Sequence, residues 1–125
     1  MPASIALLQG LEISESEWID HFDTNVKGGF LVAQKVAPGM IARGRGRVIW
    51  ISSQSGLVGI PGQPAYCSTK GAVIQLVRTL GVEWAKHGIT VNSVAPTFVE
   101  TNLTRQRLQI LNSVPSRSAR YQPES

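Results

Sequence analysis

Apolar residues recur at the spacing of one helix face along the first third of the chain. They are Trp18, Phe22, Val26, Phe30, Ala33, Ala37 and Met40. Ser14, followed three residues later by Glu17, is typical of a capping box at a helix start. We therefore expect one long helix over residues 15–43, in which Pro38 kinks or shortens the last turns.

Two short strands are predicted on either side of a second helix. The run VIWI at residues 48–51 is β-branched and aromatic without polar alternation, which favours a strand covered on both faces. Residues 54–64 are rich in glycine and proline, which indicates a loop. Helical spacing then extends over residues 65–87, and residues 89–95 are predicted as the next strand. This order predicts a βαβ unit with parallel strands and a right-handed crossover.

The composition indicates one folded domain. Of the 125 residues, 42% are hydrophobic and 16% are charged, a balance that argues against a disordered chain. No window approaches the roughly 18 apolar residues of a membrane-spanning helix. The apolar residues near the start of the chain are not preceded by a basic cluster, so we do not expect a secretory signal. The single cysteine, Cys67, excludes an internal disulfide and favours a reducing compartment, so we expect a cytoplasmic protein. The two histidines, His21 and His87, lack metal-ligand spacing.

Charge is distributed unevenly along the chain. Most acidic residues lie in the first 23 positions, whereas Arg43, Arg45 and Arg47 form one basic cluster. Such a cluster occurs in phosphate or nucleic-acid sites, but also in solvated turns whose bends glycines supply. Because no aromatic side chain alternates with the arginines, we favour the turn and expect no nucleic-acid partner. We expect residues 1–112 to form the domain and residues 113–125, dominated by serine, proline and arginine, to be a mobile tail.

Candidate chemistry lies where the first predicted strand ends, because ligands of open α/β sheets bind beyond the carboxyl ends of the strands. Ser52 and Ser53 stand there, and the next helix carries Tyr66 and, one turn later, Lys70. A free phenol has a pKa of about 10, and a neighbouring cation favours its phenolate form. Tyr66 could therefore act as an acid or base tuned by Lys70, with Ser53 donating to a substrate oxygen. A nicotinamide would supply the hydride. On its own, this spacing more often reflects a surface lysine above a partly buried tyrosine.

Four motifs in order change this balance. They are NVKGGF with Asn25, VIWISSQSG with Ser53, YCSTK with Tyr66 and Lys70, and GITVNSVAPTFVET. With them, residues 14–101 resemble the short-chain dehydrogenase/reductase family. The resemblance implies a Rossmann-like, doubly wound parallel sheet and a catalytic tetrad. In that tetrad Tyr66 is the acid/base, Lys70 holds the nicotinamide ribose, Ser53 orients the substrate oxygen and Asn25 supports a water in a proton relay.

The resemblance also implies ligands and partners. Val99 and Thr101 would meet the nicotinamide amide of NAD or NADP, although Thr101 could instead hydrogen-bond within its own loop. The substrate would be a secondary alcohol or a ketone. The helices over residues 15–43 and 65–87 would form subunit contacts in a homo-oligomer.

The sequence departs from the family pattern at both ends. A glycine-rich phosphate turn, a residue that selects between NAD and NADP, and the last strand of the family are not matched, and Thr97 stands where glycine is usual. We therefore expect a partial Rossmann-like fold that lacks the N-terminal dinucleotide-binding half, and weak or no activity in the isolated chain. The alternative is a non-catalytic fragment that associates with complete subunits.

Overall fold

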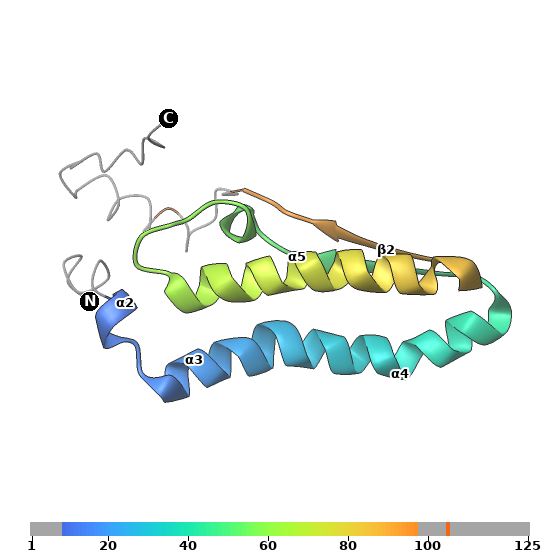
Figure 1. The fold of residues 1–125 in the computed structure, drawn as a ribbon, viewed down its shortest axis with the longest axis horizontal. Coiled ribbons are helices and arrows are strands. Elements are labelled where there is room, and N and C mark those ends of the chain that lie inside the picture. Colours follow the sequence, from blue (N-terminus) through green and yellow to red (C-terminus); the bar gives the residue numbers. More distant parts are fainter. Residues whose placement is uncertain (1–8, 98–104, 106–125) are drawn as a thin grey trace.

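The computed structural model describes residues 9–97 and residue 105. In chain order, its elements are α2 (Gln9–Glu12), α3 (Glu15–Phe22), η1 (Asp23–Lys27), α4 (Gly28–Arg43), β1 (Gly46–Ile51), η2 (Gln54–Gly56), α5 (Pro64–Trp84), η3 (Ala85–His87) and β2 (Ile89–Val94). Figure 1 shows α3, η1 and α4 as one continuous rod beside α5. Both predicted strands are confirmed within two residues of the expected bounds, and the second helix, predicted over 65–87, is observed as α5 followed by the short 3-10 helix η3.

The first rod covers the predicted range but is not one regular helix. It begins as expected, because Ser14 Oγ accepts a hydrogen bond from the backbone N–H of Glu17 at 3.1 Å. Between α3 and α4, however, η1 is a π-helical turn, which the spacing of apolar residues does not predict. Pro38 does not shorten the rod: α4 continues past it to Arg43 and ends at Gly44, whose φ is +67°. Pro38 is exposed, so water can replace the hydrogen bond that proline cannot donate.

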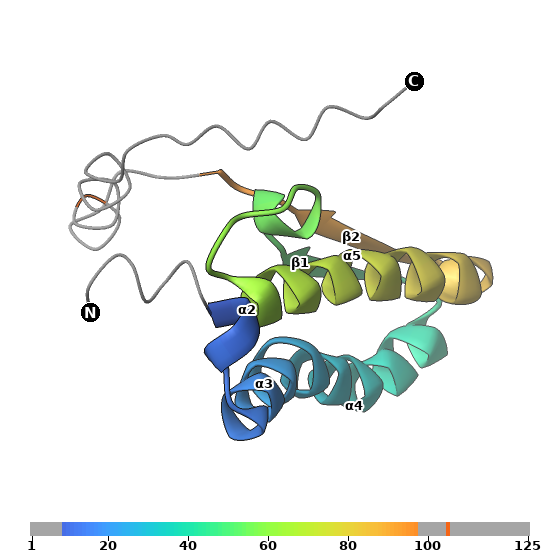
Figure 2. The same cartoon turned by 60° about the vertical axis from the view of Figure 1, so that its left-hand side comes forward.

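The two strands pair in parallel, as the βαβ prediction requires. Their register runs from Gly46 opposite Ile89 to Ile51 opposite Val94. The loop between β1 and α5 is confirmed, and it contains the short 3-10 helix η2, which lies beside the first turns of α5 (Figure 2). Proline at the first position of α5, Pro64, suits a helix start because no backbone donor is lost there.

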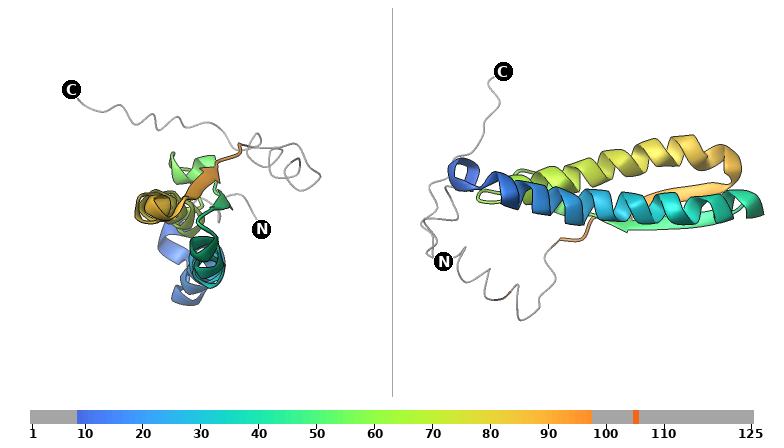
Figure 3. Two further views of the ribbon diagram at one scale, coloured as in Figure 1. Left: turned by 90° about the vertical axis from the view of Figure 1, so that its right-hand side faces the viewer. Right: turned by 90° about the horizontal axis from the view of Figure 1, so that it is seen from below.

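The core lies on one side of the sheet. Seen along the helices, α4 and α5 both lie on the same side of β1 and β2 (Figure 3). The buried cluster between them contains Ala33, Ala37, Val73, Val77, Leu80, Trp84, Ile89 and Val91. The prediction that residues 48–51 are covered on both faces is wrong for the part of the chain that the structure describes. Successive strand side chains point to opposite faces, so Ile49 and Ile51 point away from both helices and are 65% and 58% exposed.

Some sequence predictions fall on residues 98–104 and 106–125. The mobile tail over 113–125 and the contacts of Val99 and Thr101 therefore lie outside the described residues. In the described part of the chain, no helix is both long enough and apolar enough to cross a bilayer.

Candidate functional site

Two buried serines follow the carboxyl end of β1. The hydroxyl of Ser52 donates to the backbone carbonyl of Lys70 at 3.2 Å and so ties the strand end to α5. Ser53 Oγ accepts from the backbone N–H of Ser55 at 3.1 Å and caps η2. A hydroxyl has one proton to donate. Among residues 9–97, no acceptor is bonded to the hydroxyl proton of Ser53. Ser53 therefore remains able to donate to a ligand oxygen.

Tyr66 and Lys70 face the same way from the first turns of α5. The Nζ atom of Lys70 lies 5.7 Å from the centroid of the Tyr66 ring, within the range of a cation–π contact. The same Nζ donates to the backbone carbonyl of Ile51, the last residue of β1, at 3.2 Å. The helix spacing i, i+4 brings the two side chains together, and the strand end holds the ammonium beside the phenol.

The pair keeps hydrogen-bonding capacity for a ligand. An ammonium has three N–H donors, and in the described residues Lys70 uses one of them, on Ile51. The phenolic oxygen of Tyr66 has no hydrogen-bond partner in the parts of the chain that the structure describes. Both side chains are half-buried, so they are accessible at the edge of the sheet.

Asn25 lies in the π-helical turn η1, and it reaches the same helix from the other rod. Its Nδ2 donates to the hydroxyl oxygen of Thr69 at 3.1 Å, and the Thr69 hydroxyl donates to the backbone carbonyl of Tyr66 at 2.7 Å. Thr69 is fully buried. Sequence analysis did not single out Thr69; the available signal was its place in the YCSTK motif, directly before Lys70.

A glycine holds the loop against the lysine turn. A Cβ atom at Gly56 would lie 2.7 Å from the backbone carbonyl oxygen of Lys70 and from the Ile74 side chain, so any larger residue must displace η2. This close approach keeps the Ser53-bearing segment on the turn that carries Lys70. The structure thus brings Tyr66 and Lys70 together at the end of β1, with Ser53 on the adjoining segment, and joins Asn25 to the same helix through Thr69. Val99 and Thr101 lie outside the described residues.

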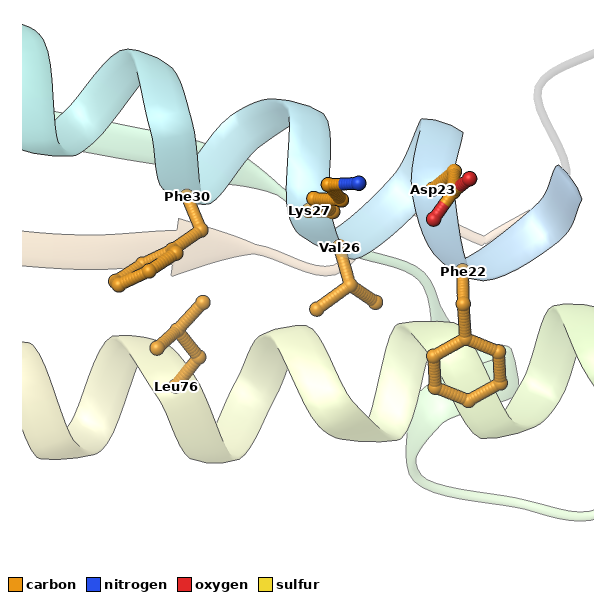
Figure 4. Close-up of a pocket in the computed structure, with 6 residues that line it drawn as sticks. All are labelled: Phe22, Asp23, Val26, Lys27, Phe30 and Leu76. Carbon is orange, nitrogen blue, oxygen red and sulfur yellow. The ribbon is translucent and has the colours of Figure 1, made fainter. Parts of the chain in front are cut away.

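Hollows lie along the first rod, and two of them adjoin η1. One, of about 300 Å³, lies between η1, α4 and α5, and in Figure 4 the side chains of Phe22, Val26 and Phe30 point toward α5 while Asp23 and Lys27 do not. The other, of about 470 Å³, is lined by Asn25 and five residues of the preceding segment. The first hollow is lined mainly by apolar side chains, together with the charged Asp23 and Lys27. Among residues 9–97 and 105, no cluster of His, Cys, Asp and Glu could hold a metal ion.

Comparison with known proteins points to one family. A family model described as short chain dehydrogenase matches residues 3–111. The chain is 41% identical over 110 residues to the 3-oxoacyl-(acyl-carrier-protein) reductase FabG of Staphylococcus epidermidis, covering 84% of this chain and 45% of the relative. It is 35% identical over 105 residues to the NAD-dependent glycerol dehydrogenase of Listeria innocua, covering 83% and 41%.

A solved structure gives the same result. The gluconate 5-dehydrogenase of Burkholderia cenocepacia, crystallised with NADP and tartrate, superposes with a TM-score of 0.73 and 38% sequence identity. The match covers 78% of this chain and 38% of that one. The chain therefore spans less than half the length of the relatives that it resembles.

Proposed function

The chain belongs to the short chain dehydrogenase family, and we propose that it carries the catalytic residues of an oxidoreductase that interconverts a secondary alcohol and a ketone with NAD or NADP. One observation carries this proposal: a phenol with no hydrogen-bond partner among residues 9–97 and an ammonium lie together at the carboxyl edge of a parallel sheet. Among the relatives, the names 3-oxoacyl reductase and gluconate 5-dehydrogenase support this type of chemistry.

Tyr66 is the acid and base of the proposed reaction. Reduction of a ketone adds a hydride to carbon and a proton to oxygen. In that direction the phenolic O–H of Tyr66 donates its proton to the ketone oxygen, and in oxidation the phenolate accepts a proton from the alcohol. The ammonium of Lys70, 5.7 Å from the ring centroid, stabilises the phenolate by electrostatic attraction.

The donors around this pair fit the nicotinamide end of a cofactor. The two N–H groups of Lys70 that Ile51 does not engage can bind hydroxyl acceptors such as those of a ribose. The nicotinamide, when bound, supplies or takes the hydride, which no side chain can do. Val99 and Thr101 are proposed to contact its amide. The relatives include an NAD-dependent enzyme and an NADP complex, so both cofactors remain candidates.

Ser53 and Asn25 complete the proposed site. Ser53 accepts from Ser55 and so keeps its proton for the substrate oxygen, which it orients toward Tyr66. Asn25 is hydrogen-bonded to Thr69, the residue before Lys70, and we propose that it supports a water that passes protons to and from the Tyr66–Lys70 pair. We propose that the protein works in the cytoplasm, because a sequence with one cysteine, Cys67, does not rely on internal disulfides.

The test removes one oxygen atom. In the full chain, Tyr66→Phe is expected to lower kcat for ketone reduction by about 10²- to 10⁴-fold, measured by the consumption of NADPH or NADH. The matched control is Tyr121→Phe, because Tyr121 is the other tyrosine of the sequence and lies outside the motifs. Equal activity of the Tyr66→Phe variant and the starting chain would contradict the proposed role of Tyr66.

A second candidate is association without catalysis, through the helices over residues 15–43 and 65–87. It is favoured by exposed apolar side chains on α4, namely Leu31, Val32 and Val36. Charge also supports it, because acidic residues lie near the start of the first rod and Arg43, Arg45 and Arg47 near its end. Two such rods packed antiparallel would bring opposite charges together.

The two candidates differ in cofactor binding and in mass. Catalysis by the isolated chain requires saturable binding of NADH or NADPH. This binding can be measured by the change in cofactor fluorescence during a titration. Association predicts a dimer or larger species by light scattering that Val32→Lys shifts toward the monomer. Lys86→Met, on the exposed η3, is the control that should leave the mass unchanged. A monomeric chain with saturable cofactor binding would exclude the second candidate.

A further inference from the structure

Thr69 links the two helical rods at the candidate site. It is the residue before Lys70 and one turn after Tyr66, yet its side chain is 0% exposed and points into the contact between α5 and η1. A threonine in a helix commonly bonds back to a carbonyl of the preceding turn, and Thr69 does so on Tyr66. Unlike an ordinary back-bonded threonine, it also accepts from Asn25, a residue 44 positions earlier.

The polarity of these two bonds follows from the single proton of a hydroxyl. The Thr69 hydroxyl donates that proton to the Tyr66 carbonyl at 2.7 Å. It can then only accept from Asn25, so the amide nitrogen of Asn25 must face Thr69. Asparagine oxygen and nitrogen are otherwise interchangeable in shape, and the bonding network decides between them. The carbonyl oxygen of Asn25 is therefore turned away from Thr69.

That oxygen is left available as an acceptor. Within residues 9–97, no donor is bonded to Asn25 Oδ1, and Asn25 lines the hollow of about 470 Å³ beside η1. The π-helical turn places Asn25 in this position, and Thr69 decides which end of its amide meets a ligand or water.

We infer that Thr69 is a positioning residue, which orients the Asn25 amide so that its oxygen accepts from a water or ligand at the site. The consequence for proton transfer rests on the proposed oxidoreductase function, whereas the orientation itself does not. An Asn25 amide with the reverse orientation would present N–H donors to the site. It could not accept a hydrogen bond from a water or a ligand hydroxyl there. Thr69 thus acts on the site through Asn25 and through the carbonyl of Tyr66, without touching substrate.

The experiment uses the ¹⁵N-labelled 125-residue chain and the side-chain amide signals of Asn25, assigned by their loss in Asn25→Ala. Thr69→Val keeps the shape of the side chain and removes the hydroxyl. It is expected to shift the Asn25 amide signals and to speed their exchange with solvent. Thr69→Ser keeps the hydroxyl and is expected to restore both. Thr79→Val is the matched control, because Thr79 also lies on α5 and donates only to the Gln75 carbonyl.

A second measurement needs no variant. In the starting chain, a through-space contact between the Asn25 amide protons and the Thr69 methyl group is expected, and it remains informative if Thr69→Val does not fold. Its absence, or Asn25 signals that are equal in Thr69→Val and the starting chain, would overturn the inference.

Turnover separates this inference from the proposed function. If the chain reduces a ketone, Thr69→Val should lower kcat by about ten- to hundredfold with little change in KM, and Thr69→Ser should recover most of it. Loss of kcat in Thr69→Val without recovery in Thr69→Ser would contradict the inference. If the chain does not turn over but the Asn25 signals respond as expected, Thr69 orients Asn25 and the proposed oxidoreductase function fails alone.

Discussion

The two faces of the β1–β2 sheet differ in burial although both carry branched apolar side chains. On the face toward α4 and α5, Ile89 and Val91 are buried against Val73, Val77 and the other core residues. On the opposite face Ile49, Ile51 and Val94 are exposed, and the described residues place nothing over them. An isoleucine thus contributes to the core or lies at the surface according to which face of the strand it occupies, not according to its type.

This difference teaches how much an apolar strand sequence can predict. A run such as VIWI indicates that a strand can be buried on both faces. In a doubly wound sheet, helices pack on both faces and bury such strands. In the described part of this chain, both helices lie on the same face. Isoleucines and strand edges that none of residues 9–97 covers favour self-association of the chain when it is produced alone.

The largest expected difference comes from the same substitution on the two faces. Ile89→Ala should lower the free energy of unfolding by about 2–5 kcal/mol, because it leaves a cavity among core side chains. Ile49→Ala should change it by less than about 0.5 kcal/mol, because Ile49 is mostly exposed. Urea denaturation of both variants measures the difference, and equal losses would show that the outer face is also packed.

A smaller effect is expected where α4 approaches the sheet. A Cβ atom at Gly29 would overlap the indole ring of Trp50, so Gly29→Ala should cost about 1–3 kcal/mol by overpacking. Thermal unfolding followed by circular dichroism, together with the fluorescence of tryptophan, would detect it. A Gly29→Ala variant as stable as the starting chain would mean that α4 does not approach β1 this closely.

The same substitution on the exposed side of α4 should have the opposite sign. Gly39 lies within the helix, and a Cβ there would meet only the end of the Arg43 side chain, at 3.4 Å. Gly39→Ala should therefore raise stability by about 0.5–1 kcal/mol, because alanine loses less conformational freedom in a helix than glycine. Destabilisation by Gly39→Ala would indicate that this side of α4 is packed.

Substitutions on the outer face of the sheet are expected to have the smallest effect on stability. They are expected to have the largest effect on self-association. Ile49→Lys together with Ile51→Lys should change the free energy of unfolding by less than about 0.5 kcal/mol. The same pair of substitutions should lower the average mass in light scattering, since charge on an exposed strand opposes edge and face pairing. An unchanged mass would place self-association on another surface, with the exposed α4 residues as the next candidates.

The sequence predicted the elements well because their signals are local. The capping serine Ser14, the helical spacing around Val73 and the β-branched runs each reflect contacts within a few residues. The π-helical turn at Asp23–Lys27 was missed because it changes the hydrogen-bond pattern without disturbing the spacing of apolar residues. Of the two effects expected of Pro38, the shortening of the helix is wrong, because whether a helix continues past proline depends on what its carbonyls meet outside the helix.

The sequence by itself determined the βαβ order and the proximity of Tyr66 to Lys70, because strand and helix periodicities are properties of a few consecutive residues. Tertiary structure alone decided that Thr69 accepts from Asn25, that Lys70 donates to Ile51 and that, among the described residues, both helices lie on one face of the sheet. Each of these contacts joins residues far apart in the chain, and their partners are chosen by how the helices pack on the strands rather than by any local pattern.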